Sequence, residues 1–336
     1  MKWYPWLRPS FEQLISAYQA GRGHHALLIH ALPGMGEDAL IYALNRWLLC
    51  QQPQGQKSCG HCRGCQLMQA GTHPDYYVAE PEKGKTTLGI DAVRAITEKL
   101  YERARQGGAK VVWLKEAAQL TEAAANALLK TLEEPPENTW FFLGCREPER
   151  LLATLRSRCF YYYLAPPETR YALAWLAREI PAAVDEEQHA ALRLSSGAPA
   201  AALALLQPEQ WQQRHALIEK LAQTLDSRDW LSLLTVLNHE QANQRLFWLA
   251  SLLLDARKIQ QGAGQWLTNT DCQPLIAHLS RQLSAAVLQA MLSDIFHCRE
   301  QLTTVAGLNR ELVLSEMLLT WERYLRPGAL LPSSAI

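Results

Sequence analysis

A group of cysteines near residue 60 carries the clearest signal for chemistry in this chain. The motif C-x8-C-x2-C-x2-C is formed by Cys50, Cys59, Cys62 and Cys65. A C-x2-C turn brings two thiolates to one ion, and four thiolates close a tetrahedral shell with no open position for catalysis. We therefore expect a structural Zn²⁺ within residues 50–65, with His61 as a bystander inside the turn. An iron–sulfur cluster is the rival, but Gln66 rather than a Cys-Pro pair follows the last thiol.

A glycine turn follows the first apolar run and has the position of a phosphate-binding loop. That loop requires the pattern G-x-x-x-x-G-K-[ST], in which the Lys holds phosphates and the hydroxyl holds Mg²⁺. Gly34 and Gly36 are present, but Ala31 replaces the first glycine, and Glu37 and Asp38 replace the Lys and the hydroxyl residue. Two carboxylates repel a triphosphate. The turn is either a nucleotide site that has lost its chemistry or an ordinary strand-to-helix turn.

The apolar run at 111–114 is similar to the strand that carries the Mg²⁺-binding carboxylate of nucleotide hydrolases. Lys115 stands in place of that Asp, and Glu116 remains at the position of the carboxylate that activates water. Without bound nucleotide Glu116 has nothing to act on, so we interpret it as a helix-entry residue favoured by the helix dipole.

Five short β-rich runs in the first half predict a parallel sheet. They are residues 26–30, 76–79, 110–114, 139–143 and 160–164. Several are apolar throughout, as expected of strands that are buried on both faces. The segments 90–104 and 120–132 have helical spacing, and Pro135-Pro136 stops the second of them. This βαβ rhythm predicts a doubly wound α/β domain.

The second half of the chain has a different character. After a boundary near Pro166-Pro167 there are helical patterns and no convincing strand. Three short helices are predicted, at 171–178, 186–194 and 200–206. A second boundary, near Gln207-Pro208, precedes a longer helical region. The predicted domains are therefore residues 1–165, 166–207 and 208–336.

Composition argues against several classes of protein. The 336 residues are 48% hydrophobic, which is enough to build packed cores in two or three domains. The formal net charge is zero, so the overall basic footprint of a dedicated nucleic-acid binder is missing. The opening residues lack the apolar core of a secretory signal, and the most apolar stretch, 246–254, is too short to cross a bilayer. We expect a cytoplasmic protein with no membrane partner.

Two further segments are specific to one family. Residues 120–136, LTEAAANALLKTLEEPP, resemble the helix after the hydrolase strand in AAA+ clamp-loader subunits, and so does the downstream Ser157-Arg158-Cys159. With the four-cysteine insertion, the whole chain resembles the gamma/tau and delta-prime family of bacterial DNA polymerase III. The resemblance implies a RecA-like AAA+ domain that carries zinc, a small helical lid, and an all-α collar that assembles the subunits into a circular pentamer.

The resemblance also implies roles for individual residues. In this family the Ser-Arg-Cys segment supplies an arginine finger to a neighbour's ATP, which gives that role to Arg158; a local salt bridge is the alternative. A lid arginine that touches nucleotide in the motor subunits is Ala200 here. Counting Glu37 and Lys115, three nucleotide contacts are missing, which indicates one cause, a site no longer used for ATP. Solvated surface is our interpretation of three nearby residues, Arg146, Arg150 and Arg156.

The family resemblance implies a stator that binds no ATP and has no activity of its own within the DNA polymerase III holoenzyme. Its partners would be the gamma/tau motor subunits and delta, with the sliding clamp and primed DNA reached through the complex. The alternative is an ATP-hydrolysing motor, which Gly34, Gly36 and Glu116 support and the charge reversal at Glu37 opposes. A zinc-dependent reader of DNA sequence is a third class, and the neutral charge argues against it.

Overall fold

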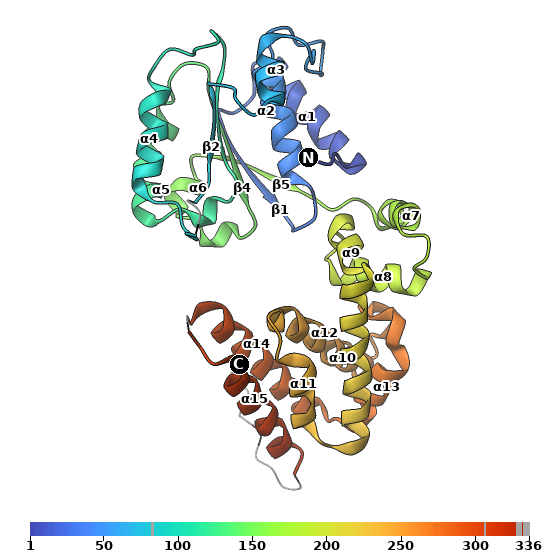
Figure 1. Ribbon diagram of the computed structural model, residues 1–336. Helices are drawn as coiled ribbons and strands as arrows, with labels where there is room; N and C mark the ends of the chain where they lie inside the picture. Colours follow the sequence, from blue (N-terminus) through green and yellow to red (C-terminus); the bar gives the residue numbers. More distant parts are fainter. Residues whose placement is uncertain (82–83, 306, 327–330, 332–336) are drawn as a thin grey trace. The chain divides into compact units, whose positions relative to one another are not determined.

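The computed structural model describes residues 1–81, 84–305, 307–326 and 331. Contacts within the chain divide it into two compact units, Met1–Pro167 and Glu168–Ile336 (Figure 1). Within the described ranges, no helix combines the length and the apolar character needed to span a membrane.

The first unit is built on a five-stranded parallel sheet with the strand order β2-β3-β4-β1-β5. The strands are β1 (Ala26–Ala31), β2 (Tyr76–Ala79), β3 (Lys110–Leu114), β4 (Thr139–Cys145) and β5 (Phe160–Leu164). The predicted sheet is confirmed, although β1 and β4 continue slightly beyond the expected ends. The central strands β1, β3 and β4 are almost wholly buried, whereas the edge strands β2 and β5 are largely accessible. Apolar runs without alternation mark central parallel strands for this reason.

Helices cover both faces of this sheet (Figure 1). They are η1 (Pro5–Leu7), α1 (Arg8–Gln19), α2 (Glu37–Leu48), α3 (Arg63–Gln69), α4 (Ile90–Leu100), η2 (Ala117–Gln119), α5 (Glu122–Glu133), η3 (Pro148–Arg150) and α6 (Ala153–Arg156). Helices α4, α5 and α6 bury one face, where Leu28, Val112 and Phe141 contribute to the core. Helices α1 and α2 pack on the opposite face, where the Tyr18 ring contacts Phe142.

Helix α4 ends earlier than its apolar spacing predicts. The expected face extended to Ala104, but the helix stops at Leu100. The buried carboxylate of Asp75 accepts hydrogen bonds from the backbone N–H groups of Arg105 and Gln106, each at 2.8 Å. A continuing helix would use those N–H groups internally, so their capture by Asp75 turns the chain away from the helix.

The described residues of the second unit form helices and no strand. The helices are α7 (Thr169–Glu179), α8 (Asp185–Leu194), α9 (Pro199–Leu205), α10 (Pro208–Ser227), η4 (Trp230–Leu233), α11 (Leu234–Leu237), α12 (Ala242–Gln260), η5 (Gly264–Trp266), η6 (Thr270–Cys272), α13 (Gln273–Gln282), α14 (Ala285–Thr304) and α15 (Arg310–Tyr324). The three predicted short helices are confirmed as α7, α8 and α9. Helix α12 is central to this unit, since α13 and α14 both pack on it around one leucine-rich core.

Candidate functional site

The glycine turn, residues 31–38, connects the carboxyl end of β1 to α2. Gly34 and Gly36 both have φ of 84°, in the left-handed region that favours glycine. A Cβ at Gly36 would lie 2.5 Å from the ring atom Cδ2 of Tyr4, so a side chain does not fit there. The indole Nε1 of Trp6 donates to the carbonyl of buried Met35 at 2.8 Å, and the Tyr4 and Trp6 rings stack at 4.7 Å. The N-terminal segment therefore packs directly on the glycine turn and holds its shape.

Three charged side chains meet beside the glycine turn, and we call them the carboxylate–arginine chain. Arg146 Nη2 lies 3.9 Å from Glu37 Oε1, and Arg146 Nε lies 3.8 Å from Glu116 Oε2. Glu116 Oε1 also accepts from the backbone N–H groups of Arg146 and Ala118, each at 3.4 Å. The bond to Ala118 gives Glu116 the helix-entry role that its sequence position favours, at the start of η2. Arg146 lies at the surface, as the sequence indicates, with its side chain 59% exposed, and its guanidinium also links two carboxylates.

Asp38 and Lys115 complete the charges around the glycine turn. Lys115 Nζ is 2.6 Å from Glu80 Oε2 and 5.6 Å from the centre of the Trp113 ring, so its ammonium is already paired. Burial raises the pKa of Asp38, while the positive charges of Lys115 and Arg146 oppose that rise. Burial also raises the pKa of Glu37, and the neighbouring carboxylate of Asp38 adds to the shift. The first turn of α2 therefore presents two crowded carboxyl groups.

Arg158 lies between α6 and β5 and is held by its own unit. Its Nε donates to Glu133 Oε1 at 2.7 Å, its Nη2 contacts the same oxygen, and its Nη1 donates to the carbonyl of Thr154 at 2.8 Å. Ser157 Oγ donates to the same carbonyl at 3.1 Å. Cys159 packs against the core between the sheet and α5, and burial raises the pKa of its thiol to about 12. The local salt bridge weighed as an alternative for Arg158 is thus present in the isolated chain.

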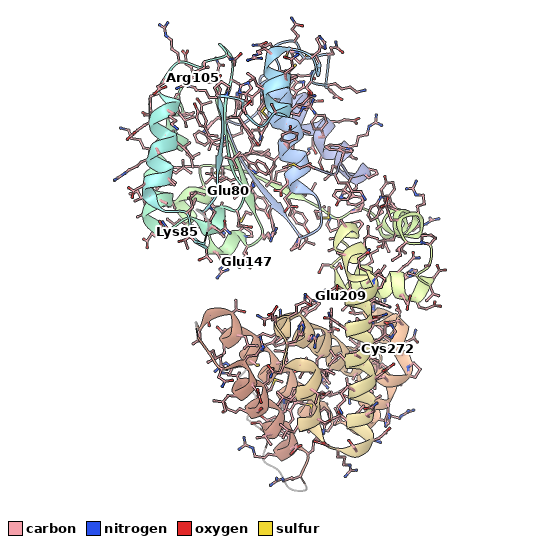
Figure 2. All side chains as sticks on the ribbon, in the orientation of Figure 1. Glu80, Lys85, Arg105, Glu147, Glu209 and Cys272 are labelled. Carbon is pink, nitrogen blue, oxygen red and sulfur yellow. The ribbon has the colours of Figure 1, made fainter. Side chains whose placement is uncertain are left out.

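Arg158 lies at the end of the sheet where β5 begins, and the glycine turn lies at the opposite end, where β1 finishes. Phe160 at the start of β5 pairs with Leu27 at the start of β1, whereas the glycine turn follows the end of β1. A strand of this length spans about 16 Å. Figure 2 shows the two ends of the sheet, with Glu80 and Glu147 at the end where strands finish and Arg105 at the end where β3 begins. Arg158 and the glycine turn of the same chain are therefore separated by about the length of a strand.

The four motif cysteines come together between the end of α2 and the start of α3. All four Sγ atoms lie within 4.8 Å of one another, and none of the four forms a disulfide. The Sγ pairs Cys50–Cys62 and Cys59–Cys65 are 3.9 and 4.0 Å apart. Four sulfurs bound tetrahedrally at 2.3 Å would be separated by about 3.8 Å, so the spacing fits a Zn²⁺ ion.

The local backbone also suits thiolate ligands. N–H groups of Cys59 and Cys62 point at the sulfurs of Cys50 and Cys59, each at 3.3 Å, and such donors favour the charged form. A Cβ at Gly64 would lie 2.3 Å from the Leu49 carbonyl oxygen, so only glycine allows this approach. The exposed His61 ring contacts the Cys59 carbonyl through Nδ1, as expected of a bystander. The residues present therefore fit a structural zinc ion.

Ala200 lies in the first turn of α9 in the second unit. Its methyl group offers no donor to a phosphate. Sequence reasoning missed Glu80 as the partner of Lys115 and Arg146 as the partner of Glu37 and Glu116, and it missed the packing of Tyr4 and Trp6 on the turn. Only the tight Gly36 position hints at a close neighbour, and no spacing rule identifies which residue it is.

The second unit contains a network of buried charges that sequence reasoning also missed. This buried network comprises Arg214, Asp255, Lys258, Asn269 and Asp271. Arg214 Nη2 donates to Asn269 Oδ1 and to Asp271 Oδ1, each at 2.9 Å. Asp255 Oδ2 accepts from the N–H and the side-chain amide of Asn269 at 2.8 and 2.9 Å. Lys258 Nζ donates to Asp255 Oδ1 at 2.7 Å. Every carboxylate in the network is satisfied, and it fastens the loop before α13 to α10 and α12.

Comparisons with known proteins match three successive segments of the chain to families. The family described as DNA polymerase III, delta subunit, matches residues 7–168. The lid domain of DNA polymerase III subunit delta-prime, described as an AAA+ ATPase lid, matches 167–207, and the C-terminal family of the delta subunit matches 208–323. The three matches together cover both units.

Relatives of full length agree with these matches. DNA polymerase III subunit delta-prime of Escherichia coli K12 is 66% identical over 332 residues, covering 99% of each chain. The Yersinia pestis subunit delta-prime is 57% identical over 333 residues, covering 98% of each chain. The gamma/tau subunit of Mycobacterium bovis is 32% identical over 194 residues, which is 56% of this chain and 33% of that protein. The chain belongs to the delta-prime subunit family of the DNA polymerase III clamp loader.

Proposed function

We propose that this chain is a stator of the clamp loader, which binds no ATP itself and supplies Arg158 to the ATP of a neighbouring gamma/tau motor subunit. The observation that carries the proposal is the carboxylate–arginine chain beside the glycine turn. Glu37 stands where a nucleotide site needs Lys, and Arg146 neutralises Glu37 and Glu116 instead of a phosphate. The positions that would bind a triphosphate are occupied by internal charge pairs.

The same contacts argue against the ATP-hydrolysing motor. Glu116 is engaged by Arg146 and by the N–H of Ala118, so it is not free to orient a water molecule. Lys115, at the Mg²⁺-binding position, is paired with Glu80 and repels a divalent cation. A motor would have to replace several such contacts at once to bind ATP with Mg²⁺.

The position of Arg158 supports action on a neighbour rather than on its own chain. It lies beside the start of β5, at the end of the sheet opposite to the glycine turn, and its partner Glu133 is exposed. An exposed ion pair is worth about 0.2–1 kcal/mol, whereas an arginine finger contributes roughly 10³–10⁵ in turnover. Releasing Glu133 to reach a phosphate therefore costs little beside the catalytic gain.

Assembly and cofactor follow from the same family membership. We infer that the chain scaffolds the clamp-loader pentamer with gamma/tau and delta, in the cytoplasm, and helps to load a sliding clamp onto primed DNA. It would have no enzymatic activity of its own, as one component of the polymerase holoenzyme. Zn²⁺ held by Cys50, Cys59, Cys62 and Cys65 would fix the chain between α2 and α3.

The first experiment titrates the purified, zinc-loaded chain with a fluorescent ATP analogue in the presence of Mg²⁺. The proposal expects no saturable binding, because the Lys, the Asp and the lid Arg are all missing. Saturable binding in the micromolar range would overturn it and return Glu116 to candidacy as a catalytic residue.

The second experiment measures the ATPase rate of gamma/tau in the complete assembly with Arg158→Ala. We expect a large fall in turnover with assembly unchanged, and little rescue by Arg158→Lys, because a Lys lacks the planar bidentate fork. Arg150→Ala is the matched control, since Arg150 is a nearby exposed arginine whose ion pair is with Glu147, three residues before it. Equal rates for the Arg158 and Arg150 variants would contradict the finger assignment.

The third experiment tests the zinc proposal by metal analysis. Wild-type chain should carry about one zinc per molecule, and Cys65→Ser should lose it, because three thiolates no longer close the shell. Hydrogen exchange should then rise in residues 50–69 while α5 stays protected. Cys298→Ser, which alters a buried cysteine of the second unit, is the control and should keep its zinc. Iron in place of zinc in wild-type chain would contradict the assignment.

A further inference from the structure

Glu133 lies at a helix end that does not favour a carboxylate. It is the last residue of α5, and Glu134 follows it as the C-cap. The partial negative charge at the C-terminus of a helix disfavours acidic side chains in the last turn. The end of α5 is nonetheless fixed, because His25 Nε2 lies 2.7 Å from the Leu132 carbonyl oxygen and ties it to the segment just before β1. The backbone that carries Glu133 is therefore anchored beside Arg158, at the end of the sheet where β5 begins.

The side chain of Glu133 binds one edge of the Arg158 guanidinium. Nε and Nη2 of Arg158 both contact Glu133 Oε1, the first of them at 2.7 Å, and Nη1 donates to the Thr154 carbonyl at 2.8 Å. Three of the five N–H groups of the guanidinium are thus engaged, by a side chain of α5 and by the backbone of α6. Among the described residues the other two N–H groups, one on Nη1 and one on Nη2, have no partner. The guanidinium is therefore fixed along its Nε edge, and each terminal nitrogen keeps one donor.

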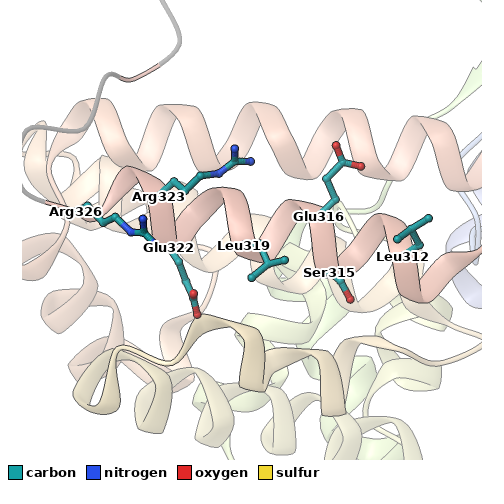
Figure 3. A pocket seen from close by; sticks show the side chains of 7 residues that line it. All are labelled: Leu312, Ser315, Glu316, Leu319, Glu322, Arg323 and Arg326. Carbon is teal, nitrogen blue, oxygen red and sulfur yellow. The ribbon is translucent and has the colours of Figure 1, made fainter.

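An arginine without such a carboxylate partner is found on α15. Arg323 lines a surface groove of that helix together with Arg326 (Figure 3). Its Nη2 donates at 2.7 Å to the hydroxyl of Thr320, one turn earlier in the same helix. Within the described part of the chain Arg323 forms no ion pair, so only a contact to its own helix restrains its guanidinium. Arg158 differs, because two separate helices hold its guanidinium.

We propose that Glu133 is a positioning residue for Arg158, which keeps the terminal N–H groups of the guanidinium directed toward the ATP of the neighbouring motor subunit. This inference rests on the finger role proposed above for Arg158. An unheld arginine side chain must lose its rotational freedom when it stabilises a transferring phosphate. A guanidinium that Glu133 and Thr154 already hold has lost much of that freedom beforehand. Contact with a phosphate through the two remaining N–H groups also leaves the Glu133 pair in place.

Two other roles for the same ion pair lead to different predictions. A latch would keep Arg158 away from the phosphate, so its removal would speed the motor. A purely structural pair would leave the motor unchanged. The donors left on both terminal nitrogens argue against a latch, because a latch has to occupy the donors that a phosphate would use. The place of Glu133 argues against a purely structural role, since an exposed pair adds little stability and a carboxylate at a helix C-terminus is unfavourable.

The test measures kcat and KM for ATP of the motor in the complete assembly with gamma/tau and delta. We expect Glu133→Ala to lower kcat about tenfold, because a misplaced finger stabilises the transition state less well, while KM for ATP stays within about twofold of wild type. Glu133→Gln should lower kcat less, since its amide oxygen still accepts from Nε. Folding is not in question, because Glu133→Ala removes an unfavourable charge from an exposed helix end.

The matched control is Glu134→Ala, which removes the neighbouring exposed carboxylate and should leave kcat equal to that of wild type. A kcat for Glu133→Ala equal to or above that of wild type would overturn the proposal, and so would an equal fall in the control.

A double variant shows whether Glu133 acts through Arg158. Glu133→Ala in the Arg158→Ala background should cause no further fall in kcat, because the group that it positions is already absent. A further fall as large as that of the single variant would mean that Glu133 acts elsewhere, and would overturn the proposal. Sedimentation should show equal assembly for all the variants. Weaker assembly of Glu133→Ala would also overturn the proposal, since Glu133 would then be an interface contact.

The outcomes separate this inference from the proposed function. If Arg158→Ala slows the motor ATPase and Glu133→Ala does not, the positioning role is wrong and the finger role stands. If Arg158→Ala leaves the ATPase rate unchanged, the finger role itself fails.

Discussion

The carboxylate–arginine chain of the first unit and the buried network of the second unit use the same residue types under opposite conditions. Around Arg146 the carboxylates lie 3.8 and 3.9 Å away, and the arginine side chain is 59% exposed. Around Arg214 the acceptors lie within 2.9 Å, and Asp255 is 0% exposed. Water satisfies what the loose pairs leave open, whereas a buried charge must find every partner within the protein.

This difference separates a group of charges at the surface from a buried network that joins several elements of the fold. The pairs beside the glycine turn can be long, because solvent completes the hydrogen bonds of the exposed Arg146 guanidinium. The buried network must be complete, because each unpaired group in it would carry its full cost of desolvation. Its partners come from α10, α12 and the loop before α13, so they fix these elements relative to one another.

Among the variants that test this comparison, Asp255→Ala should have the largest effect on the free energy of unfolding. The change leaves the N–H groups of Thr268 and Asn269 without their acceptor, and it removes the buried carboxylate that Lys258 binds. We expect the second unit to lose about 3–5 kcal/mol of unfolding free energy. Hydrogen exchange of α10 and α12 under mild denaturant measures this loss.

The control for that experiment is Asp226→Ala, which removes an exposed carboxylate from the same unit and should change stability by about 0.5 kcal/mol at most. A loss below about 1 kcal/mol for Asp255→Ala would show that the buried network does not hold these elements together.

A smaller effect is expected for Arg146→Ala beside the glycine turn. Arg146 is mostly exposed and its contacts to Glu37 and Glu116 are long, so the first unit should lose at most about 1 kcal/mol. The variant should still fail to bind ATP, since removing a positive charge leaves the two carboxylates facing a triphosphate. If Arg146→Ala lost as much unfolding free energy as Asp255→Ala, the two networks would not differ in their contribution to stability.

The smallest effect is a change in pH dependence produced by Glu37→Gln. Burial raises the pKa of Glu37 above its ordinary value of 4.5, so the folded state binds this proton more tightly than the unfolded state does. Its contribution to stability is fully present below pH 4.5 and is lost as the pH rises through the folded-state value. The variant lacks this titration.

Urea unfolding of Glu37→Gln should therefore show less loss of stability than wild type between pH 4.5 and neutrality. Glu134→Gln, which changes an exposed residue of the same unit, serves as the control and should follow the wild-type curve. A Glu37→Gln curve parallel to wild type would mean that burial of this carboxyl does not matter to folding.

Local sequence patterns predicted much of the secondary structure of the first unit. All five strands lie where apolar runs predicted them, and α5 begins after Thr121, whose side chain accepts from the Ala124 N–H as an N-cap. Local patterns did not predict where α4 ends, because that end depends on Asp75, which lies just before β2. Spacing describes what one segment does on its own, and it is silent about a carboxylate that arrives from elsewhere.

By itself, the sequence determined the places of the five strands and of α5, α7, α8 and α9, the four-thiol motif, and the absence of a lysine from the glycine turn. These are statements about residue type and short spacing, which backbone geometry converts directly into structure. Only the tertiary structure decided that Arg146 joins Glu37 to Glu116, that Trp6 packs on the glycine turn, and that Asp255 holds the loop before α13. Each of these contacts joins segments far apart in the chain, and such pairs are set by how helices and strands pack together.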